Sequence, residues 1–448
     1  MTPIETLAET AWAGAIARHP DPGFRDRIVA ANALYAGRPV CVHRTPVFLS
    51  ADELRRWQVR LARFHRIVRV ARARLLGDLD REECSLAAAI GVDRQARIWA
   101  QMDPGYVSAA PLARLDAFVA EGLPQFVELN AEAPAGMGYA AALAACFTRD
   151  PAWAASNVPL RHIDPLPSLR ATLRALWRER ALLRGTGPER PATVAILDFA
   201  GGGTAPDLQL IRDDFRAHGL PCEVVDPADL TYDGERLAAG DFPIDLVFRR
   251  AVVRDLRQRS EAIGALLAAL REGRVCMVNP LRTALLHTKG LFSLLHAPTL
   301  LLDAADRRFV TRHIPETLLL VPPTLGGPVI GPHPDDTRER VRASPDQWVL
   351  KPVDEHGGTG VILGWTCTRA AWESAVDNAT HHVVQWRVPT PRKRVYDTRD
   401  GAFHARMVTI DPFLARGRLA GFLSRIADGE LANATTGGAT QTPLFIAG

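Results

Sequence analysis

Five polar side chains in three separate stretches could together bind phosphate and a divalent metal ion. In the first stretch, 125–138, Glu128 and Asn130 alternate with apolar residues, which predicts a short strand leading into a Pro/Gly turn. Side chains two positions apart on a strand share a face, so these two oxygen donors converge, and Glu132 is a further donor. Mg²⁺ takes one or two protein carboxylates and completes its shell with phosphate and water. An edge strand whose polar face meets solvent would show the same pattern.

The second stretch, 348–364, has the pattern of a β-hairpin with a Gly-rich turn. Apolar runs at 348–350 and 361–363 predict its strands, with Lys351 ending the first strand and Glu355 beginning the turn. Three glycines let the backbone approach a ligand without interference from Cβ atoms: Gly357, Gly358 and Gly360. The N–H groups of such a turn can bind phosphate, although an ordinary turn would carry the same glycines.

The third stretch, 279–295, is predicted to be helical and carries one lysine, Lys289, in apolar company. A lysine there can place its positive charge against phosphate oxygens. Alternatively, its side chain extends along the apolar surface to reach solvent.

Helices and a small parallel sheet are predicted around these stretches. Apolar residues at helical spacing predict an amphipathic helix over 50–80, and a second helix is predicted over 110–121. From residue 193 strands and helices alternate, which is typical of a parallel sheet. The predicted strands are 193–199, 222–225, 245–248 and 275–278, with a helix over 206–219.

Two features of this predicted sheet could bind a substrate. Gly201 to Gly203 follow its first strand, but their spacing is not that of a dinucleotide-binding loop, and no Lys-Ser/Thr pair follows as in a P-loop. We expect a β–α turn at a switch point of the sheet, where ligands bind. Arg249 and Arg250 follow a later strand, where they could bind a carboxylate or lie on the surface.

The last third of the chain continues with a predicted exposed loop over 324–342 and a helix over 368–378. The stretch 382–389 is predicted to be a buried strand that runs into a Pro-marked connector. Small polar residues between Asn433 and Gly438 predict a mobile loop that could close over a substrate.

The composition and charge of the chain disfavour several classes of function. The 448 residues are 47% hydrophobic and 23% charged, an ordinary globular composition, and the length predicts two or three subdomains. A net charge of +4 is small, and arginines alternate with acids, which disfavours nucleic-acid binding. The apolar runs are short of the ~18 residues that span a bilayer, and 1–16 lack a basic start, so we expect a soluble, cytoplasmic protein. Six scattered cysteines without a CxxC pair disfavour a zinc site or a disulfide framework.

Lys289, Lys351 with its Gly-rich turn, and the segment 383–388 together resemble the nucleotide site of ATP-grasp enzymes. In that fold two lobes enclose ATP. The Glu-Leu-Asn element at 128–130 lies far upstream of the hairpin, an order similar to that of circularly permuted glutathionylspermidine synthase-like and eukaryotic glutathione synthetase-like ligases. The resemblance covers the chain from Arg114 to its C-terminus.

This resemblance implies a role for each matched position. The implied Mg²⁺ ligands are Glu128, Asn130 and Glu355, and the implied phosphate-binding residues are Lys289, Lys351, Gly357 and Gly358. Gln385, Trp386 and Val388 match the adenine-binding hinge, although Trp386 stands where relatives often carry an acid. Arg425, Asn433, Gly437 and Gly438 resemble elements on the substrate side, where Arg425 would orient the acceptor carboxylate or stabilise an oxyanion.

The implied fold is α/β (α+β): a circularly permuted ATP-grasp fold with an inserted small parallel-sheet subdomain for the substrate. Its expected parts are an N-terminal helical region with the metal-binding strand (1–160), a Rossmann-like subdomain (161–280) and the nucleotide-binding lobes (281–448).

The implied activity is an ATP- and Mg²⁺-dependent carboxylate–amine ligase that works through an acyl phosphate. Its substrates would be small molecules such as amino acids, peptides or polyamines, with no nucleic-acid or membrane partner, and a homo-oligomer is compatible with this. The alternatives are a small-molecule kinase and a catalytically silent nucleotide-binding scaffold.

Overall fold

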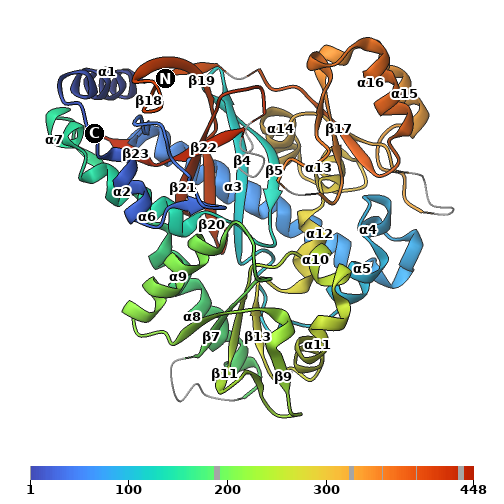
Figure 1. Cartoon of the computed structure of the whole chain (residues 1–448). Coiled ribbons are helices and arrows are strands. Elements are labelled where there is room, and N and C mark those ends of the chain that lie inside the picture. The colour runs from blue at the N-terminus through green and yellow to red at the C-terminus, as the bar shows by residue number, and fades with distance from the viewer. Residues whose placement is uncertain (1, 186–191, 322–326, 356, 390, 432–437) are drawn as a thin grey trace.

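A seven-stranded antiparallel sheet lies at the centre of the molecule (Figure 1). The computed structural model describes residues 2–185, 192–321, 327–355, 357–389, 391–431 and 438–448. The strands run in the order β18-β19-β21-β20-β4-β5, and β22 pairs with β21. Their bounds are β4 (Leu112–Ala120), β5 (Leu123–Asn130), β18 (Arg392–Asp397), β19 (Ala402–Val408), β20 (Asp411–Ala415), β21 (Arg418–Ala427) and β22 (Ala439–Thr442). Strands that lie hundreds of residues apart in the sequence are therefore direct neighbours.

The helix predicted over 110–121 is wrong, because this segment forms β4. It pairs antiparallel with β5 through a two-residue turn in which Glu121 and Gly122 have φ values of 51° and 77°. Positive φ at both turn positions matches the right-handed twist of a hairpin and stops a helix. Arg114 and Asp116 in this segment alternate with the buried apolar residues Ala113, Leu115 and Ala117, as the two faces of a strand allow.

A four-stranded parallel sheet lies at the lower end of the molecule in Figure 1. Its order is β13-β12-β7-β8, with β7 (Val194–Leu197), β8 (Cys222–Val225), β12 (Leu246–Arg249) and β13 (Cys276–Val278). Its helices are α8 (Pro165–Leu183), α9 (Ala205–Ala217), α10 (Val253–Gln258) and α11 (Gly264–Arg271), and a small antiparallel sheet joins β9 (Leu230–Tyr232), β10 (Leu237–Ala239) and β11 (Phe242–Ile244). The alternating strands and helices predicted from residue 193 are confirmed.

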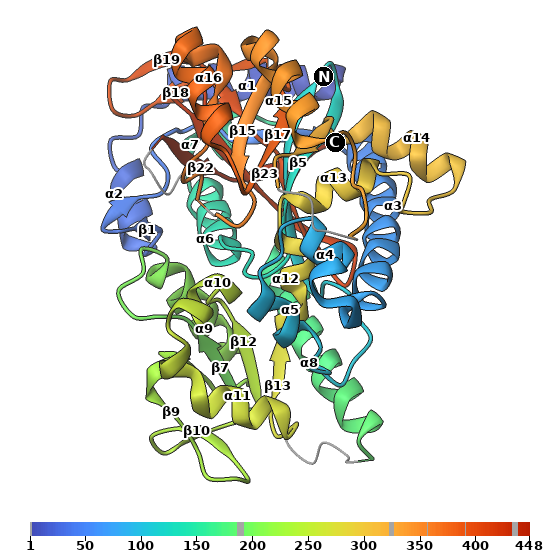
Figure 2. The same ribbon diagram turned by 90° about the vertical axis from the view of Figure 1, so that its right-hand side faces the viewer.

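The predicted Gly-rich hairpin belongs to a second four-stranded sheet at the opposite end of the molecule from the parallel sheet (Figure 2). Its order is β14-β17-β15-β16, with β14 (Thr317–Leu319), β15 (Trp348–Pro352), β16 (Ile362–Leu363) and β17 (His382–Trp386). Two helices accompany it, α15 (Pro334–Ala343) and α16 (Arg369–Asn378). The loop predicted over 324–342 is wrong from Pro334 onward, because this proline stands at the first turn of α15, where its missing N–H costs nothing.

The helix predicted over 279–295 is interrupted next to Lys289. It forms α12 (Ala284–His287) and α13 (Gly290–His296), and the N–H of Lys289 between them donates to the carbonyl of Val353 at 3.0 Å. A side chain at Gly290 would collide with the backbone of Ile90. The break therefore holds Lys289 against the hairpin sheet.

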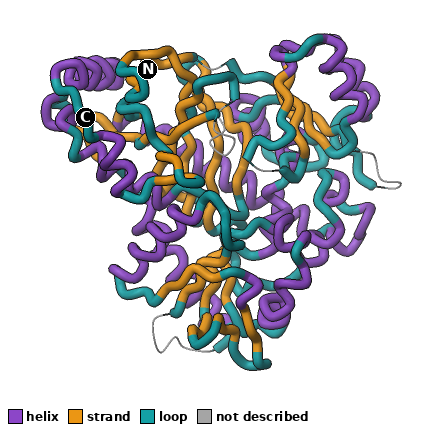
Figure 3. The backbone as a smooth tube through the Cα atoms, viewed as in Figure 1, coloured by secondary structure: helices purple, strands orange, loops and turns teal. Residues whose placement is uncertain are grey.

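The N-terminal part packs around the central sheet. The predicted amphipathic helix is α3 (Ala51–Leu76), capped by Ser50, whose hydroxyl accepts from the N–H of Glu53 at 3.2 Å. Figure 3 shows helices packed around the central strands. A small sheet in the order β3-β23-β6 joins early and late segments: β3 (Val47–Ser50), β6 (Leu160–Arg161) and β23 (Leu444–Ala447).

The other helices and strands are α1 (Pro3–Arg18), α2 (Phe24–Ala30), α4 (Leu86–Ala89), α5 (Arg94–Ala100), α6 (Met137–Thr148), α7 (Pro151–Ala155), α14 (Ala304–His313), β1 (Leu34–Tyr35) and β2 (Arg38–Pro39). Across the described residues, no helix is both long enough and apolar enough to cross a bilayer. No disulfide joins the cysteines of the described residues.

Candidate functional site

A cavity of about 730 Å³ lies where the three larger sheets meet. Its walls come from β4 and β5, from the hairpin of β15 and β16, from β17, and from the turns that follow β7 and β12. Every metal- or nucleotide-binding residue that the family resemblance implies lines it: Glu128, Asn130, Lys289, Lys351, Glu355, Gly357, Gly358, Gln385, Trp386 and Val388.

Glu128 forms an ion pair with Lys289, with Oε1 3.2 Å from Nζ. Burial alone would raise the pKa of Glu128, but the positive charges of Lys289, Lys351 and His287 together outweigh burial and lower that pKa. The carboxylate is therefore ionised at neutral pH, as a metal ligand must be. Asn130 donates from Nδ2 to Asp116 Oδ1 at 3.0 Å, which fixes the orientation of its amide.

Lys351 lines the same cavity, and a residue on the neighbouring strand β17 holds its side chain. Its Nζ donates to Gln385 Oε1 at 2.7 Å, and Gln385 Nε2 donates to Thr317 Oγ1 at 3.0 Å. Burial lowers the pKa of Lys351 to about 8; the charge of Glu128 opposes this shift, and that of Lys289 adds to it. An anionic ligand beside Nζ would favour the charged ammonium again.

Glu355 is held from two sides. Its carboxylate forms an ion pair with Arg254 on α10, and its backbone carbonyl accepts from Lys289 Nζ. Arg254 also donates to the carbonyl of Asp354 at 3.1 Å. A metal ion bound by Glu355 would therefore have to replace or share a guanidinium.

The predicted adenine hinge runs along the cavity at the end of β17. The side chain of Gln385 is buried, whereas Trp386 is 37% exposed and meets Trp348 edge to face, with ring centroids 5.1 Å apart. The N–H of Trp386 donates to the carbonyl of Glu316, and that of Arg387 donates to the carbonyl of Gln347. These two N–H groups are thus already engaged within the protein.

Arg425 lines the cavity from β21, within an acidic network. Its guanidinium pairs with Asp116 Oδ2 and with Asp411 Oδ2, each at 2.8 Å, and Arg114 Nε donates to Asp116 Oδ1 at 3.0 Å. Burial would raise the pKa of Asp116, but Arg114 and Arg425 outweigh burial and lower it to about 2. For Asp411 burial prevails and raises the pKa.

Arg114 and Asp116 are cavity residues that the sequence analysis missed. They lie two positions apart on β4, with Arg114 opposite Asn130 and Asp116 opposite Glu128 in the register with β5. The missed signal is the alternation of 112–118, in which each polar side chain is flanked by buried apolar ones.

Two candidate residues have structural roles. Glu132, considered as a further metal donor, is 3% exposed and accepts from Arg249 Nη1 at 3.1 Å. Arg249, considered for carboxylate binding, is fully buried and also donates to the carbonyls of Asn279 and Ala251. The pair fixes the segment after β5 against the end of β12, and neither residue lines the cavity.

The structure describes only part of the predicted C-terminal loop. Asn433 and Gly437 lie outside the described residues. Gly438 directly precedes β22 and is not among the described residues that line the cavity.

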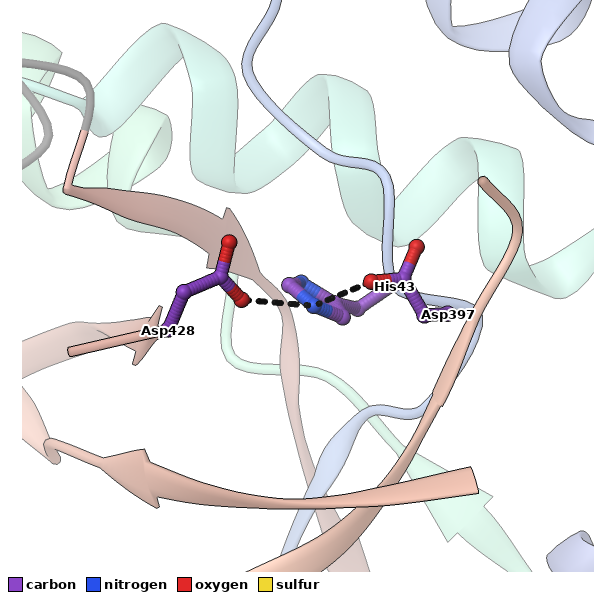
Figure 4. Close-up of side chains that lie close together, drawn as sticks. All are labelled: His43, Asp397 and Asp428. Carbon is purple, nitrogen blue, oxygen red and sulfur yellow. Dashed lines mark ion pairs between the residues drawn. The ribbon is translucent and has the colours of Figure 1, made fainter. Parts of the chain in front are cut away.

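A group of side chains of the types that can bind a metal lies elsewhere. His43 Nε2 is 3.6 Å from Asp397 Oδ2 and 3.8 Å from Asp428 Oδ1 (Figure 4). Arg399 pairs with both carboxylates and Arg406 with Asp428, so two arginines balance the two acids. Burial lowers the pKa of His43 to about 4, which keeps the ring neutral. We interpret this group as a charge-balanced contact between the loop before β3, the hairpin of β18 and β19, and the end of β21.

The comparisons with known proteins bear on the fold. No protein-family description matches the sequence, and no curated protein matches it. Among solved structures, a glutathione synthetase-like effector from Globodera pallida, in its apo form, is similar over almost its whole length. The superposition spans 99% of this chain and 97% of the effector, with a TM-score of 0.58 and 10% identity.

Two further solved structures are less similar. The superposition on a putative γ-glutamylcysteine synthetase from Methylobacillus flagellatus spans 83% of this chain and 86% of the synthetase, with 13% identity and a TM-score of 0.43. The superposition on a RimK domain ATP-grasp protein from Sphaerobacter thermophilus spans 56% of this chain and 90% of the RimK domain protein, with 18% identity and a TM-score of 0.28. These two scores are too low to support an argument.

At 10% identity, the likeness to the effector establishes a shared architecture and not an activity. The strand with the predicted metal ligands precedes the Gly-rich hairpin along this chain, but the circular permutation itself stays a prediction. The full-length superposition shows that this chain shares the fold of the glutathione synthetase-like effector, which agrees with the ATP-grasp fold that the sequence resemblance implies.

Proposed function

We propose that the chain is an ATP- and Mg²⁺-dependent ligase that joins a carboxylate to an amine. The observation that carries this proposal is the convergence of Glu128, Asn130, Lys289, Lys351 and Glu355 in one cavity. Two carboxylates and an amide are oxygen donors of the kind that Mg²⁺ prefers, and two lysines supply charge for phosphate oxygens. The ionised Glu128 and the lowered pKa of Lys351 both fit a site that exchanges its internal partners for Mg²⁺ and phosphate.

Phosphoryl transfer spreads negative charge over the transferred oxygens, so positioning and cations dominate its catalysis. Lys289 and Lys351 would hold the phosphates of ATP. Glu128, Asn130 and Glu355 would hold Mg²⁺, which when bound screens the phosphate charge.

In the first step an oxygen of the substrate carboxylate attacks the γ-phosphorus, the bond from that phosphorus to the bridging oxygen breaks, and ADP leaves. In the second step the amine nitrogen attacks the acyl carbon and the carbon–oxygen bond to phosphate breaks. The products are an amide, phosphate and a proton.

Arg425 has a supporting role in this proposal. Its two carboxylate partners hold the guanidinium at the cavity wall, where it can stabilise a substrate carboxylate or the oxyanion of the second step.

The test is ADP release with Mg·ATP across amino acids, peptides and polyamines, with mass spectrometry of the products. We expect ADP release that requires an acid and an amine together and yields their condensation product. Glu128→Gln should lower turnover by about a hundredfold, because it removes one charged metal ligand. ADP release with one substrate and a stable phosphorylated product would instead identify a kinase. Wild-type turnover in Glu128→Gln would contradict the proposed site.

A further inference from the structure

Strand β18 has an outer edge that is only half covered. It is an edge strand of the central sheet and lies beside α1 at the top of Figure 1. At its far end the carbonyl of Tyr396 accepts from the N–H of Arg44 at 3.0 Å, and the N–H of Tyr396 donates to Thr45 Oγ1 at 2.9 Å. At its near end, no described residue bonds to the outer backbone groups of Arg392 and Arg394.

The period of the strand identifies these open groups. In an antiparallel pair, the N–H and C=O groups of successive residues point alternately toward the partner strand and away from it. The backbone groups of Tyr396 point away from β19, so those of Arg394 and Arg392 do so as well. The near end of β18 therefore presents hydrogen-bond donors and acceptors to whatever lies beside it.

Pro46 explains why the covering segment stops halfway. Continued in register from the bridge between His43 and Asp397, residue 46 would stand opposite Arg394. A proline has no N–H with which to extend the pairing. The chain instead turns into β3, where the N–H of Val47 donates to the carbonyl of residue 443 at 3.0 Å.

The open edge borders a groove of about 1610 Å³. Arg392, Lys393 and Arg394 line it, together with residues from the first halves of α1 and α3, from β3 and from the turn between β4 and β5. Apolar side chains also contribute to its walls, among them Val408 and Ile410. The groove is thus long enough and apolar enough to receive a chain segment and not only an ion.

The groove differs from the cavity of the candidate site. Trp386, Arg387, Val388 and Arg392 line both, so the predicted hinge separates the two. Among the described residues, none of those proposed to hold Mg²⁺ or phosphate lines the groove. A ligand of the groove is therefore neither the nucleotide nor a substrate of the proposed reaction.

The groove carries an excess of positive charge. Basic side chains outnumber acidic ones along it, and several of them are neutralised by ion pairs. Arg312 and Arg394 have no carboxylate within 4.0 Å in the described part of the chain, and Arg394 lies over the ring of Phe403 at 4.2 Å. Glu121 is an acid of the groove that has no basic partner within that distance among the same residues. Acidic side chains of a ligand would neutralise the two arginines.

We propose that this groove binds an extended acidic segment of another protein, which pairs with the open edge of β18. The backbone of the segment bonds to the outer N–H and C=O groups of Arg394 and Arg392, as an added strand does. Acidic side chains at alternate positions meet Arg394 and Arg312, and the apolar side chains between them cover the apolar wall. An edge that carries Arg-Lys-Arg repels basic strands, so charge selects the partner together with backbone pairing. The inference does not depend on the proposed ligase activity.

Fluorescence anisotropy with the full chain and a labelled octapeptide of alternating glutamate and valine tests this proposal. We expect the peptide to bind at least about tenfold more tightly than an octapeptide of alternating lysine and valine, because charge reversal replaces attraction by repulsion. Arg394→Glu should weaken binding of the acidic peptide by about tenfold or more. Arg149→Glu makes the same change at an exposed position outside the groove and should leave the affinity unchanged.

N-methylation of the peptide separates strand pairing from simple charge attraction. In an extended alternating peptide, the N–H groups of the glutamates point to one edge and those of the valines to the other. Methylation of one set blocks the edge that meets β18, whereas methylation of the other set leaves that edge open. We therefore expect one methylated peptide to lose about tenfold or more in affinity and the other to bind as the parent peptide does.

The outcomes decide both parts of the proposal. Absence of binding by the acidic peptide, equal affinity for the acidic and basic peptides, or wild-type affinity in Arg394→Glu would overturn the acidic ligand. Equal effects of the two methylation patterns would overturn the pairing with β18. The thermal unfolding midpoint of Arg394→Glu is the folding control, and it should match that of the wild-type protein because this side chain is exposed.

Discussion

Glu128 and Glu132 are four residues apart, and their environments differ in a way that only the structure reveals. Glu128 faces the cavity beside Lys289, whereas Glu132 accepts from Arg249 and from the N–H of Val253 in a buried pair. Both were considered as metal donors because both are acids in one short stretch. The neighbouring side chains, which come from distant segments, decide which acid remains available for a ligand.

We therefore expect Glu132→Gln to destabilise the protein by about 3–5 kcal/mol, because it leaves the charge of Arg249 buried without its partner. Glu128→Gln is the matched control. It should change the free energy of unfolding by less than about 1 kcal/mol, since its pair with Lys289 borders the cavity. Urea unfolding of both variants measures the difference, and equal losses of stability would contradict the distinction between the two acids.

The pKa of Lys351 predicts a pH dependence of nucleotide binding. With a pKa of about 8 in the free protein, roughly half of the molecules carry a neutral amine at pH 8. Phosphate favours the charged ammonium, so it raises this pKa in the complex. Binding near pH 8 should therefore take up as much as about half a proton, and affinity should fall as pH rises above 8.

Calorimetry of Mg·ATP binding at pH 8, in two buffers with different heats of ionisation, measures this proton uptake. Lys351→Met is the control, and the contribution of this residue should disappear in it. Identical uptake in the wild-type protein and in the variant would show that Lys351 does not meet the phosphates.

At the scale of elements, the sequence predicted the Gly-rich hairpin, α3 and the parallel sheet, because each has a local pattern that its surroundings do not override. It failed for β4, where a short apolar alternation was interpreted as a helix. The two-residue turn at Glu121 and Gly122 pairs β4 with β5, and pairing of that kind leaves only a weak local signal. The same error hid Arg114 and Asp116, since polar residues on a helix would not face Asn130 and Glu128.

Helix α10 connects the parallel sheet to the hairpin through Arg254 and Glu355. Because Mg²⁺ would compete with this guanidinium for the carboxylate, we expect Arg254→Ala to tighten Mg·ATP binding by about two- to fivefold, the effect of one partly exposed ion pair. Fluorescence titration with a labelled ATP analogue over a range of Mg²⁺ concentrations measures it.

Arg257→Ala on the same helix is the matched control. Arg257 pairs with Asp93 and lies 3.8 Å from Asp354, so its loss leaves the pair of Glu355 with Arg254 in place. Weaker Mg·ATP binding in Arg254→Ala alone would mean that Arg254 supports the nucleotide instead of competing with its metal.

For the whole molecule, the first and last parts of the chain share one apolar cluster. It includes Trp12, Phe48, Phe147 and Phe445, and Phe445 meets Trp153 edge to face with centroids 4.9 Å apart. The sequence showed these residues as separate apolar positions. Their contact depends on the pairing of β23 with β3 and β6, which no local pattern specifies.

Phe445→Ala should therefore destabilise the protein by about 3–5 kcal/mol, through lost burial and the cavity that remains. Phe445→Leu fills most of that volume and should cost clearly less. Urea unfolding followed by tryptophan fluorescence measures both, since Trp12 and Trp153 belong to or flank this cluster. A small effect of the alanine variant would show that the cluster is not shared between the two parts.

The place of β23 also sets an order of events during synthesis on the ribosome. Val47 and Arg161 are made long before Leu444 and Ile446, their neighbours in the three-stranded sheet. The backbone groups of β3 and β6 that pair with β23 therefore stay unpaired until β23 has been translated. For β3 this takes nearly four hundred further residues. Such early, unpaired edges are open to association with other nascent chains. Slow translation through the last strands would lengthen that exposure, and a chaperone that covers β3 would shorten it.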